Sequence, residues 1–292
     1  MKNIFIIGGS GFLGYYLIKQ LKKKNNLYCH INKTTFKENS LKTIKFNLTN
    51  KIELKKFFLK KKINLIINLS SIANVNLCEK FKKKAHKIHV KIPKILSKIA
   101  KLLNIKIVHI STDHLYDGKS RRSYSETSIT NPLNYYAKTK KYGEKEIAKS
   151  KKNLIIRTNF FGKNIINKNS FTDRIIFNLK KLNIIHLWRD VYFSPMHIKY
   201  LCIIIEFLIN KNEQGIYNVS TSKISKYKLG VLIAKKMKLQ FKKIIPKRFD
   251  LRKFIIRPKN MSLSNLKLLT KYPNLKKYLL LNSQINLLKK DY

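Results

Sequence analysis

A glycine-rich segment near the start of the chain constrains the fold more than any other feature. Gly8, Gly11 and Gly14 have the spacing G-x-x-G-x-x-G, and they follow the apolar run Ile4–Ile7 and open the helix-patterned stretch Phe12–Leu21. A strand, a tight glycine turn and a helix in this order form the phosphate-binding start of a Rossmann-type sheet. The N–H groups and the positive dipole end of such a helix stabilise phosphate. The segment therefore predicts a dinucleotide site, and the alternative is a glycine-rich turn that holds no ligand.

The rest of the first half alternates short apolar runs with amphipathic stretches. Apolar patterning predicts strands and helices in turn: strands at Leu27–Ile31, Thr43–Phe46, Leu65–Ile67, Ile105–Ile110 and Leu154–Ile156, and helices at Ile52–Phe58, Glu79–Leu103 and Tyr135–Lys149. Pro93 predicts a kink or a break in the longest of these helices. Strands that alternate with helices indicate an α/β fold, a doubly wound parallel sheet covered on both faces.

Beyond about Thr158 the pattern becomes looser. Helices are expected at Phe171–Leu182, Ile198–Ile209 and Lys226–Met237, with short strands at Ile184–Ile185 and Ile216–Val219. We therefore predict a dinucleotide-binding domain over residues 1–160. Residues 161–292 are expected to form mainly a smaller α+β lobe that binds the substrate, with part of this segment returning to the first domain.

The charge balance is strongly basic. Lys and Arg number 64 against 14 Asp and Glu, a net charge of +50, which first suggests a polyanion partner. The basic residues are scattered along the whole chain, however, and Lys, Asn and Ile are abundant together, as in AT-rich coding. We therefore expect a lysine-coated surface that attracts anionic ligands such as nucleotides, with no specific nucleic acid partner. The alternative, a polyanion-binding protein, predicts nucleic acid binding with a strong salt dependence.

Cysteine spacing and hydropathy indicate a cytoplasmic protein. Cys29, Cys78 and Cys202 are odd in number and far apart, so a disulfide framework or a zinc site is not expected, and each is predicted to be a small buried side chain. No apolar run approaches the ~20 residues of a membrane span, and the first residues lack the pattern of a signal peptide. The histidines show no paired metal spacing, and we expect no metal and a surface or loop position for five of them: His30, His86, His109, His186 and His197.

A tyrosine and a lysine four residues apart suggest acid-base chemistry. Tyr136 and Lys140 lie near the start of a predicted helix, where this spacing puts both side chains on one face. A phenol with a pKa near ~10 is a poor proton donor, and a neighbouring ammonium lowers that pKa. Thr112 directly follows a predicted strand, at the edge where open α/β sheets bind ligands, and its hydroxyl could hold the substrate oxygen that Tyr136 protonates. The alternative for Thr112 is a loop cap.

The end of the second predicted strand bears on the choice of dinucleotide. An acidic residue there would bind the ribose 2′-hydroxyl and favour NAD. The sequence instead continues with Asn32 and Lys33, and the lysine could pair with a 2′-phosphate. NADP is therefore slightly favoured over NAD, with a solvated surface lysine as the alternative interpretation of Lys33.

Together these motifs resemble the extended short-chain dehydrogenase/reductase family. Within it, the chain is similar to the dTDP-4-dehydrorhamnose reductases. Ser111–Gly118 reads S-T-D-H-L-Y-D-G and resembles their S-T-D-Y-V-F-D-G, and Pro132–Lys140 resembles their P-L-N-V-Y-G-K-T-K. Shorter matches follow at Ser194-Pro195, Gly215–Val219 and Arg257-Pro258, so that the resemblance covers nearly the whole chain.

The resemblance implies an NAD(P)H-dependent reduction of a nucleotide-activated 4-keto sugar in deoxysugar and cell-surface polysaccharide biosynthesis. Tyr136 would donate the proton, Lys140 would hold the nicotinamide ribose, and Thr112 would orient the substrate carbonyl. Arg174 and Lys199 are candidates for the substrate phosphates, and a homodimer is kept as an open expectation. Together with Tyr136 and Lys140, the residues expected at the cofactor are Gly8, Ser10, Gly11, Phe12, Leu13, Gly14, Asn47, Leu48, Ser71, Ile72 and Ala73.

The sequence departs from this family at several positions. His114 replaces a Tyr, Asn47 and Asn76 each replace an Asp, and His89 stands where the family has an Asn on the long helix. These departures leave the sugar undetermined. The alternatives are another nucleotide-sugar epimerase or reductase of the extended family, or a non-catalytic, cofactor-binding regulatory subunit with the same fold.

Overall fold

The structure is a computed structural model that describes residues 1–31, 42–166, 169–250 and 255–292. It divides into two compact units, each assembled from three stretches of chain. The first unit contains Met1–Ser111, Asn134–Ile156 and Ile205–Ile216, and the second contains Thr112–Leu133, Arg157–Ile204 and Tyr217–Tyr292. The division at residue 160 stays a prediction about domains.

A seven-stranded sheet forms the centre of the first unit, in the order β11-β6-β5-β4-β1-β2-β3. The strands are β1 (Lys2–Ile7), β2 (Asn25–His30), β3 (Lys42–Ile44), β4 (Leu65–Asn68), β5 (Lys106–Ile110), β6 (Leu154–Arg157) and β11 (Gly215–Asn218). The pairs from β6 to β3 are parallel. The strand order reverses beside β1, which pairs with both β2 and β4, and open sheets of this kind bind ligands at such a reversal. The predicted Rossmann-type fold is confirmed.

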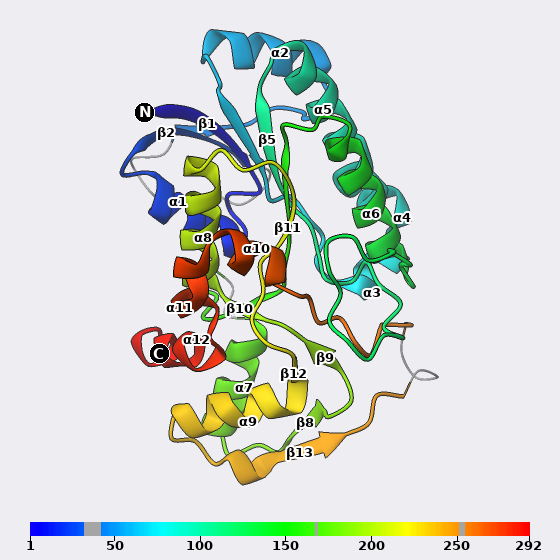
Figure 1. Ribbon diagram of the computed structural model, residues 1–292, viewed down its shortest axis with the longest axis vertical. Helices are drawn as coiled ribbons and strands as arrows, with labels where there is room; N and C mark the ends of the chain where they lie inside the picture. Colours follow the sequence, from blue (N-terminus) through cyan, green and yellow to red (C-terminus); the bar gives the residue numbers. More distant parts are fainter. Residues whose placement is uncertain (32–41, 167–168, 251–254) are drawn as a thin grey trace. The chain divides into compact units, whose positions relative to one another are not determined.

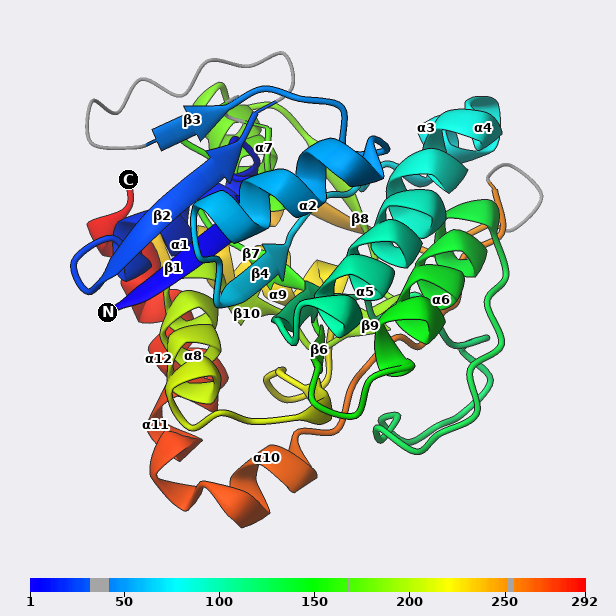
Figure 2. The same ribbon diagram turned by 90° about the horizontal axis from the view of Figure 1, so that it is seen from above.

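Helices cover both faces of this sheet. Figure 2 shows α2 (Lys51–Lys60), α5 (Ile92–Leu102) and α6 (Tyr135–Ala148) on one face and α1 (Phe12–Leu21) on the other. The helix α8 (Ile198–Asn210) begins in the second unit and ends in the first. The central strands β1, β4 and β5 are largely apolar without alternation because both of their faces are buried: Phe5, Ile66 and Ile107 are all 0% exposed.

The long helix predicted at Glu79–Leu103, which includes α5, is interrupted at Phe81, and the segment before α5 is divided into shorter helices. This segment consists of α3 (Val75–Lys80), α4 (Lys82–His86) and a π-helical turn, η1 (Lys87–Lys91), and the break falls at Phe81, whose φ of −116° and ψ of 58° are not helical. Pro93 is the second residue of α5, and the π-helical turn η1 leads directly into that helix. The helix therefore changes from a π-helical turn to an α-helix directly before Pro93, and the predicted kink at this proline stays a prediction.

The π-helical turn packs very closely against α6. A Cβ atom added to Gly143 would lie 2.0 Å from the carbonyl oxygen of His89, so only glycine allows this approach. The close packing places η1 beside the helix that carries Tyr136 and Lys140.

The second unit has the α+β character that the sequence predicts. It contains three two-stranded sheets, β7 with β10, β9 with β12 and β8 with β13. Their strands are β7 (Phe160–Phe161), β8 (Ile185–Trp188), β9 (Tyr192–Phe193), β10 (Met196–His197), β12 (Ile224–Ser225) and β13 (Ile244–Lys247). The helices are α7 (Phe171–Lys180), α9 (Lys226–Lys236), η2 (Phe241–Lys243), α10 (Leu266–Lys271), η3 (Pro273–Leu275), α11 (Lys276–Leu279), α12 (Leu281–Asn286) and η4 (Leu287–Lys290). Figure 1 shows α7 and α9 beside β8.

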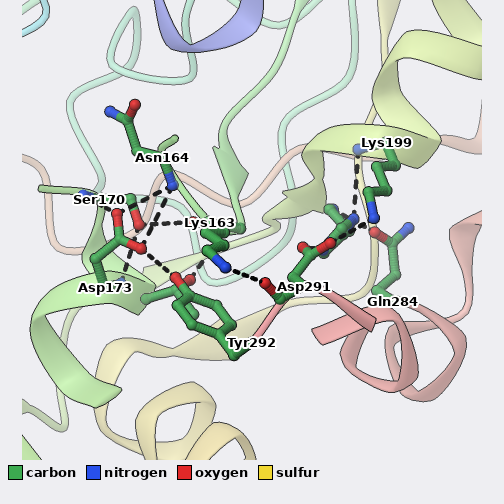
Figure 3. Close-up of polar contacts among 11 residues, drawn as sticks. Lys163, Asn164, Ser170, Asp173, Lys199, Gln284, Asp291 and Tyr292 are labelled. Carbon is green, nitrogen blue, oxygen red and sulfur yellow. Dashed lines mark hydrogen bonds and ion pairs between the residues drawn. The ribbon is translucent and has the colours of Figure 1, made fainter. Parts of the chain in front are cut away.

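Asp291 and Tyr292 make several polar contacts within the second unit (Figure 3). The Asp291 carboxylate lies 2.9 Å from Nε2 of His197 and 2.5 Å from Nζ of Lys199, and the Tyr292 hydroxyl donates to Asp173. Lys199, expected as a candidate for substrate phosphate, is therefore held by a carboxylate.

Burial agrees with the sequence for the cysteines but not for all of the histidines. All three cysteines are buried, as predicted. His30, His109 and His197 are buried as well, at 9%, 2% and 0% exposure, so the predicted surface or loop position is wrong for them. Each ring has a hydrogen-bond partner, on Phe46, Asn68 and Asp291 respectively, which offsets the cost of burying a polar group.

Within the parts of the chain that the structure describes, the helices are all too short or too polar to span a bilayer. Among the same residues, no group of His, Cys, Asp and Glu side chains is arranged to hold a metal ion.

Candidate active site

The glycine loop connects β1 to α1 with no room for side chains at two positions. Gly8 has a φ of 81°, and a Cβ atom there would lie 2.9 Å from the backbone of Leu69 and Ser70, in the segment that follows β4. A Cβ atom on Gly14 would lie 2.4 Å from the carbonyl oxygen of Gly9 and 2.5 Å from that of Gly8. The loop is thus pressed against both its own helix and the neighbouring strand end.

The first turn of α1 fits a bound pyrophosphate. Its N-cap residue is Gly11, which has no side chain to cap the helix, and the first turn contains no acidic residue. Ser10 and Phe12 are half-buried, whereas Leu13 is buried. A helix start that lacks a side-chain cap and follows a close glycine turn leaves backbone N–H groups and dipole charge for an anion. The residues present therefore fit the phosphates of a dinucleotide.

The segment after β4 is held in a defined conformation. The side-chain oxygen of Asn68 accepts hydrogen bonds from the backbone N–H of Ser70 at 3.2 Å and from its hydroxyl at 2.6 Å. Ser71 and Ala73 are exposed, and Ile72 is half-buried. The residues predicted at the nicotinamide thus lie on an ordered, accessible segment that touches the glycine loop at Gly8.

Asn47 and Leu48 are the residues predicted to lie near the adenine of the cofactor. Asn47 is exposed, and its side-chain oxygen accepts hydrogen bonds from the backbone N–H and the hydroxyl of Thr49, at 3.0 and 2.8 Å. The side chain of Leu48 packs in the core of the first unit. The cofactor role of both residues stays a prediction. Lys33, the candidate for a 2′-phosphate, lies outside the described residues.

Local contacts fix the start of α6, the helix that carries Tyr136 and Lys140. The side chain of Asn134 caps the helix by accepting the N–H of Ala137 at 3.0 Å. A carboxylate oxygen of Glu79 accepts the N–H of Tyr135 at 2.7 Å, which also places a negative charge at the positive end of the helix dipole. Tyr136 and Lys140 are 8% and 3% exposed, so both are held with little solvent around them.

Lys140 is anchored at the carboxyl end of β5. Its Nζ donates a hydrogen bond of 2.7 Å to the carbonyl oxygen of Ile110. Burial lowers the pKa of Lys140 to about 8, although the charge of Glu144, one turn further along α6, acts in the opposite direction. Glu144 is itself buried and accepts a 2.6 Å hydrogen bond from the hydroxyl of Ser111. The sequence motif contained Glu144, but nothing in its spacing assigned it this contact.

Thr112 is the first residue of the second unit. Its Oγ1 lies 3.3 Å from Oδ1 of Asp113 and accepts the backbone N–H of His114 at 3.2 Å. These contacts agree with the alternative interpretation of a loop cap, and the catalytic role of Thr112 stays a prediction. Burial raises the pKa of the neighbouring Asp113 to about 7, although a hydrogen bond from Asn159 opposes that shift.

A pocket of about 340 Å³ lies within the second unit. Its lining combines cations with aromatic rings and contains no Asp or Glu; the residues are Phe171, Arg174, Ile175, Asn178, Ile185, His186, Leu187, Trp188, Lys226 and Arg257. The ammonium of Lys226 lies 4.9 Å from the centre of the Trp188 ring. Burial and the positive charge of Arg257 lower the pKa of Lys226 to about 8. Such a lining suits a ligand with an aromatic ring and several negative charges.

The buried ammonium predicts how stability depends on pH. In the window from the folded-state pKa of about 8 to the ordinary value of 10.5, the unfolded chain binds a proton at Lys140 and the folded chain does not. Stability therefore rises with pH in this window. As the pH increases through this window, we expect the free energy of unfolding of the wild-type protein to rise relative to that of Lys140→Met. The rise should reach up to about 3 kcal/mol, because one pKa unit corresponds to ~1.36 kcal/mol. Urea unfolding of both proteins below and above this window measures the difference, and Lys138→Met, at an exposed position of α6, is the control. Parallel pH profiles for the wild type and Lys140→Met would contradict the expected result.

Comparisons with known proteins agree with this geometry. The family model described as "RmlD substrate binding domain" matches residues 1–278. A dTDP-4-dehydrorhamnose reductase of Aggregatibacter actinomycetemcomitans is 29% identical over 171 residues, which are 57% of this chain and 55% of that protein. The chain thus spans about half the length of this curated relative. The β-subunit of methionine adenosyltransferase 2 from Xenopus laevis is 23% identical over 245 residues, 80% of this chain and 71% of that protein.

A solved structure gives a match over almost the full length. The crystal structure of a hypothetical dTDP-4-dehydrorhamnose reductase from Sulfolobus tokodaii has a TM-score of 0.81 and 29% sequence identity, and the match covers 91% of this chain and 93% of that one. With the family model spanning almost all of the residues, the resemblance predicted from the sequence motifs is confirmed. The chain belongs to the RmlD substrate binding domain family, within the extended short-chain dehydrogenases/reductases.

Proposed function

We propose that this protein is an NAD(P)H-dependent reductase of a nucleotide-activated 4-keto sugar, comparable to the dTDP-4-dehydrorhamnose reductases that it resembles. The observation that carries the proposal is the state of Lys140. Its buried ammonium is anchored to the carbonyl of Ile110 at the end of a central strand, on the same helix as Tyr136 and in the same unit as the glycine loop. Keeping a buried charge costs stability, and a proton-transfer site that needs a nearby cation gives a reason to keep it.

In the proposed reaction, the residues of this chain handle a proton. Tyr136 donates the proton of its hydroxyl to the substrate oxygen as negative charge develops there, and the Lys140 ammonium makes the phenol more acidic. Thr112 hydrogen-bonds the same oxygen. The nicotinamide cofactor, when bound, supplies the hydride. The glycine loop and the first turn of α1 hold its phosphates, and the burial of Tyr136 and Lys140 keeps water away from the proton donor.

The pocket of the second unit supports a nucleotide-linked substrate. Arg174 and Arg257 offer planar guanidinium groups, which match phosphate oxygens, and Phe171 and Trp188 offer rings for a base. Among the described residues, those that line the pocket include no Asp or Glu, which favours a diphosphate over a cationic ligand. The expected substrate is therefore a sugar attached to a nucleoside diphosphate.

The cofactor preference, the location and the assembly complete the proposal. NADP(H) remains slightly favoured over NAD(H) because no acidic residue follows β2 in the sequence, where Asn32 and Lys33 stand. A cytoplasmic location suits a biosynthetic enzyme of this family. A homodimer remains a proposal, and measurement of the mass in solution tests it.

Oxidation of NADPH and NADH, followed by absorbance with a panel of 4-keto nucleotide sugars, tests the proposed reaction. We expect turnover with at least one of these sugars, and faster turnover with NADPH. Failure of the wild-type protein to reduce any member of the panel would refute the proposed substrate class.

Arg174 gives a test of the nucleotide pocket. We expect Arg174→Ala to raise the KM for the nucleotide sugar about tenfold or more, because a charged hydrogen bond to phosphate contributes about 1.5–3 kcal/mol. The KM for NADPH should stay within about twofold of the wild-type value, since the predicted cofactor residues belong to the first unit. Arg189→Ala is the matched control, because Arg189 is exposed and does not line the pocket. Equal KM values for Arg174→Ala and Arg189→Ala would contradict this assignment.

A second candidate function is a regulatory subunit that binds the cofactor without turnover. The likeness to the β-subunit of methionine adenosyltransferase 2 favours it, because that match covers 80% of this chain. The presence of Thr112, Tyr136 and Lys140 argues against it. Under this alternative, Tyr136→Phe would leave the biological role unchanged.

A further inference from the structure

The buried imidazole of His89 contacts two segments of the proposed cofactor site at once. His89 lies in the π-helical turn η1 and is 2% exposed. Its Nε2 accepts the backbone N–H of Ile72 at 2.9 Å and lies 3.2 Å from the hydroxyl of Ser71. Its Nδ1 lies 2.9 Å from the hydroxyl of Thr139 on α6. One ring therefore joins the segment after β4 to the helix of Tyr136 and Lys140.

The partners determine which nitrogen of the ring carries the proton. A backbone N–H can only donate, so Nε2 must be the unprotonated nitrogen that accepts from Ile72. The proton of the neutral ring then lies on Nδ1 and is donated to Thr139. Burial and the positive charge of Lys140 lower the pKa of His89 to about 3, so the ring stays neutral near pH 7.

The hydrogen bonds continue from Thr139 into the backbone of the proposed proton donor. The carbonyl oxygens of Tyr135 and Tyr136 both lie 2.9 Å from the Thr139 hydroxyl and share its single proton. The His89 ring also makes an edge contact with the Tyr136 ring, with their centres 5.7 Å apart. The segment Ser71–Ile72 and the first turn of α6 are thus connected through one side chain.

We propose that His89 is a positioning residue, which holds the segment Ser71–Ile72 in place against α6 so that the nicotinamide half of the cofactor meets a preformed surface beside Tyr136. This inference rests on the proposed function, because it takes Ser71–Ile72 to lie at the nicotinamide. π-Helical turns occur frequently at functional sites, and this one aims a single ring at both segments. Preformed surfaces bind more tightly because less conformational entropy is lost on binding.

Substituting His89 by asparagine or by glutamine tests the contacts of its two ring nitrogens one at a time. The asparagine amide is short and reaches about as far as Nδ1, so it can donate to Thr139 but cannot reach Ile72. The glutamine amide is longer, and its oxygen can replace Nε2 as the acceptor for Ile72. His89→Asn should therefore release the Ser71–Ile72 segment, whereas His89→Gln should keep it.

The test compares two ligands that differ only in the nicotinamide ring. The Kd of NADPH and the Kd of 2′-phospho-ADP-ribose, which lacks the nicotinamide ring but keeps its ribose, are measured by calorimetry. For His89→Asn we expect the Kd of NADPH to rise about tenfold, because one hydrogen bond and the fixed conformation of the segment are lost. The Kd of 2′-phospho-ADP-ribose should change less than about twofold. For His89→Gln we expect both Kd values to stay within about threefold of wild type. Equal losses for both ligands, or equal losses for both variants, would overturn the inference.

If His89→Asn does not fold, a second pair of variants at Thr139 tests the positioning role of His89. Thr139→Val keeps the shape of the side chain but removes the acceptor of the Nδ1 proton, and Thr139→Ser keeps the hydroxyl. We expect Thr139→Val to weaken NADPH binding at least about threefold, with little change for 2′-phospho-ADP-ribose, and Thr139→Ser to match the wild type. No difference between the Val and Ser variants would count against His89 as a positioning residue.

The outcomes also separate this inference from the proposed function. A wild-type protein that binds NADPH but reduces no keto sugar would refute the proposed reaction, while the ligand comparison would still decide the role of His89. Turnover of a keto sugar with unchanged NADPH binding in His89→Asn would refute the inference alone. Absence of any dinucleotide binding by the wild type would refute both.

Discussion

Tyr136→Phe is expected to lower kcat by about 10²–10⁴-fold while NADPH still binds. The substitution removes one oxygen from a side chain that is 8% exposed, and the ring can keep its edge contact with His89. A positioned general acid typically contributes about 10²–10⁴-fold to the rate, so kcat should fall by about that factor. The measurement is NADPH oxidation with the best substrate of the keto-sugar panel, combined with the Kd of NADPH.

The neighbouring residue provides the control for this substitution. Tyr135→Phe also removes one phenol oxygen from α6, but Tyr135 contributes to the helix start through its backbone N–H, which the substitution leaves in place. Its kcat should equal the wild-type value. A Tyr136→Phe enzyme with wild-type kcat would show that the phenol is not the proton donor.

Gly14→Ala is expected to cause the largest loss of cofactor binding. The added Cβ atom would lie 2.4 and 2.5 Å from two carbonyl oxygens of the glycine loop, closer than real Cβ contacts allow, so the loop or the helix must shift. The shift would misplace the N–H groups that hold the phosphates. We expect the Kd of NADPH to rise by about a hundredfold or more, since several hydrogen bonds to one anion would be disturbed together. Calorimetry with NADPH measures this effect.

A substitution at another glycine of the same unit is the control for Gly14→Ala. It shows whether a loss of NADPH binding comes from the displaced loop or from lower stability of the protein. Gly215 has a φ of 80°, and no atom lies within 4 Å of a Cβ added there. Gly215→Ala should therefore cost about 1 kcal/mol of stability through backbone strain and leave the Kd of NADPH unchanged. If both variants bind NADPH equally well, the close contacts of Gly14 have no part in cofactor binding.

Much of the first unit could be predicted from the sequence because its signals are local. Strands buried on both faces appear as continuous apolar runs, and Ile4–Ile7, Leu65–Ile67 and Ile105–Ile110 all lie in or beside observed strands. The glycine loop was predictable for the same reason, since its turn, its close approach and its helix start depend on residues within one short segment. The break in the long helix at Phe81 was missed because no proline or glycine marks it.

The contacts of the candidate site were much harder to predict. Tyr136 and Lys140 follow from a spacing of four on one helix, but the anchoring of Lys140 on Ile110 joins residues 30 positions apart. The buried positions of His109 and His197 likewise depend on partners distant in sequence. His109 lies inside the predicted strand Ile105–Ile110, so its burial could have been predicted, whereas His197 lies in no predicted strand.

Sequence spacing was therefore sufficient for most strands and helices of the first unit, the glycine loop and the tyrosine–lysine pair on one helix, because period and turn chemistry act over a few residues. Packing of distant segments was needed to show that Gly143 admits the carbonyl of His89, that Glu144 accepts Ser111, and that one imidazole joins Ile72 to Thr139. These contacts depend on how the helices cover the sheet, and that arrangement minimises the free energy of the whole unit rather than of any single segment.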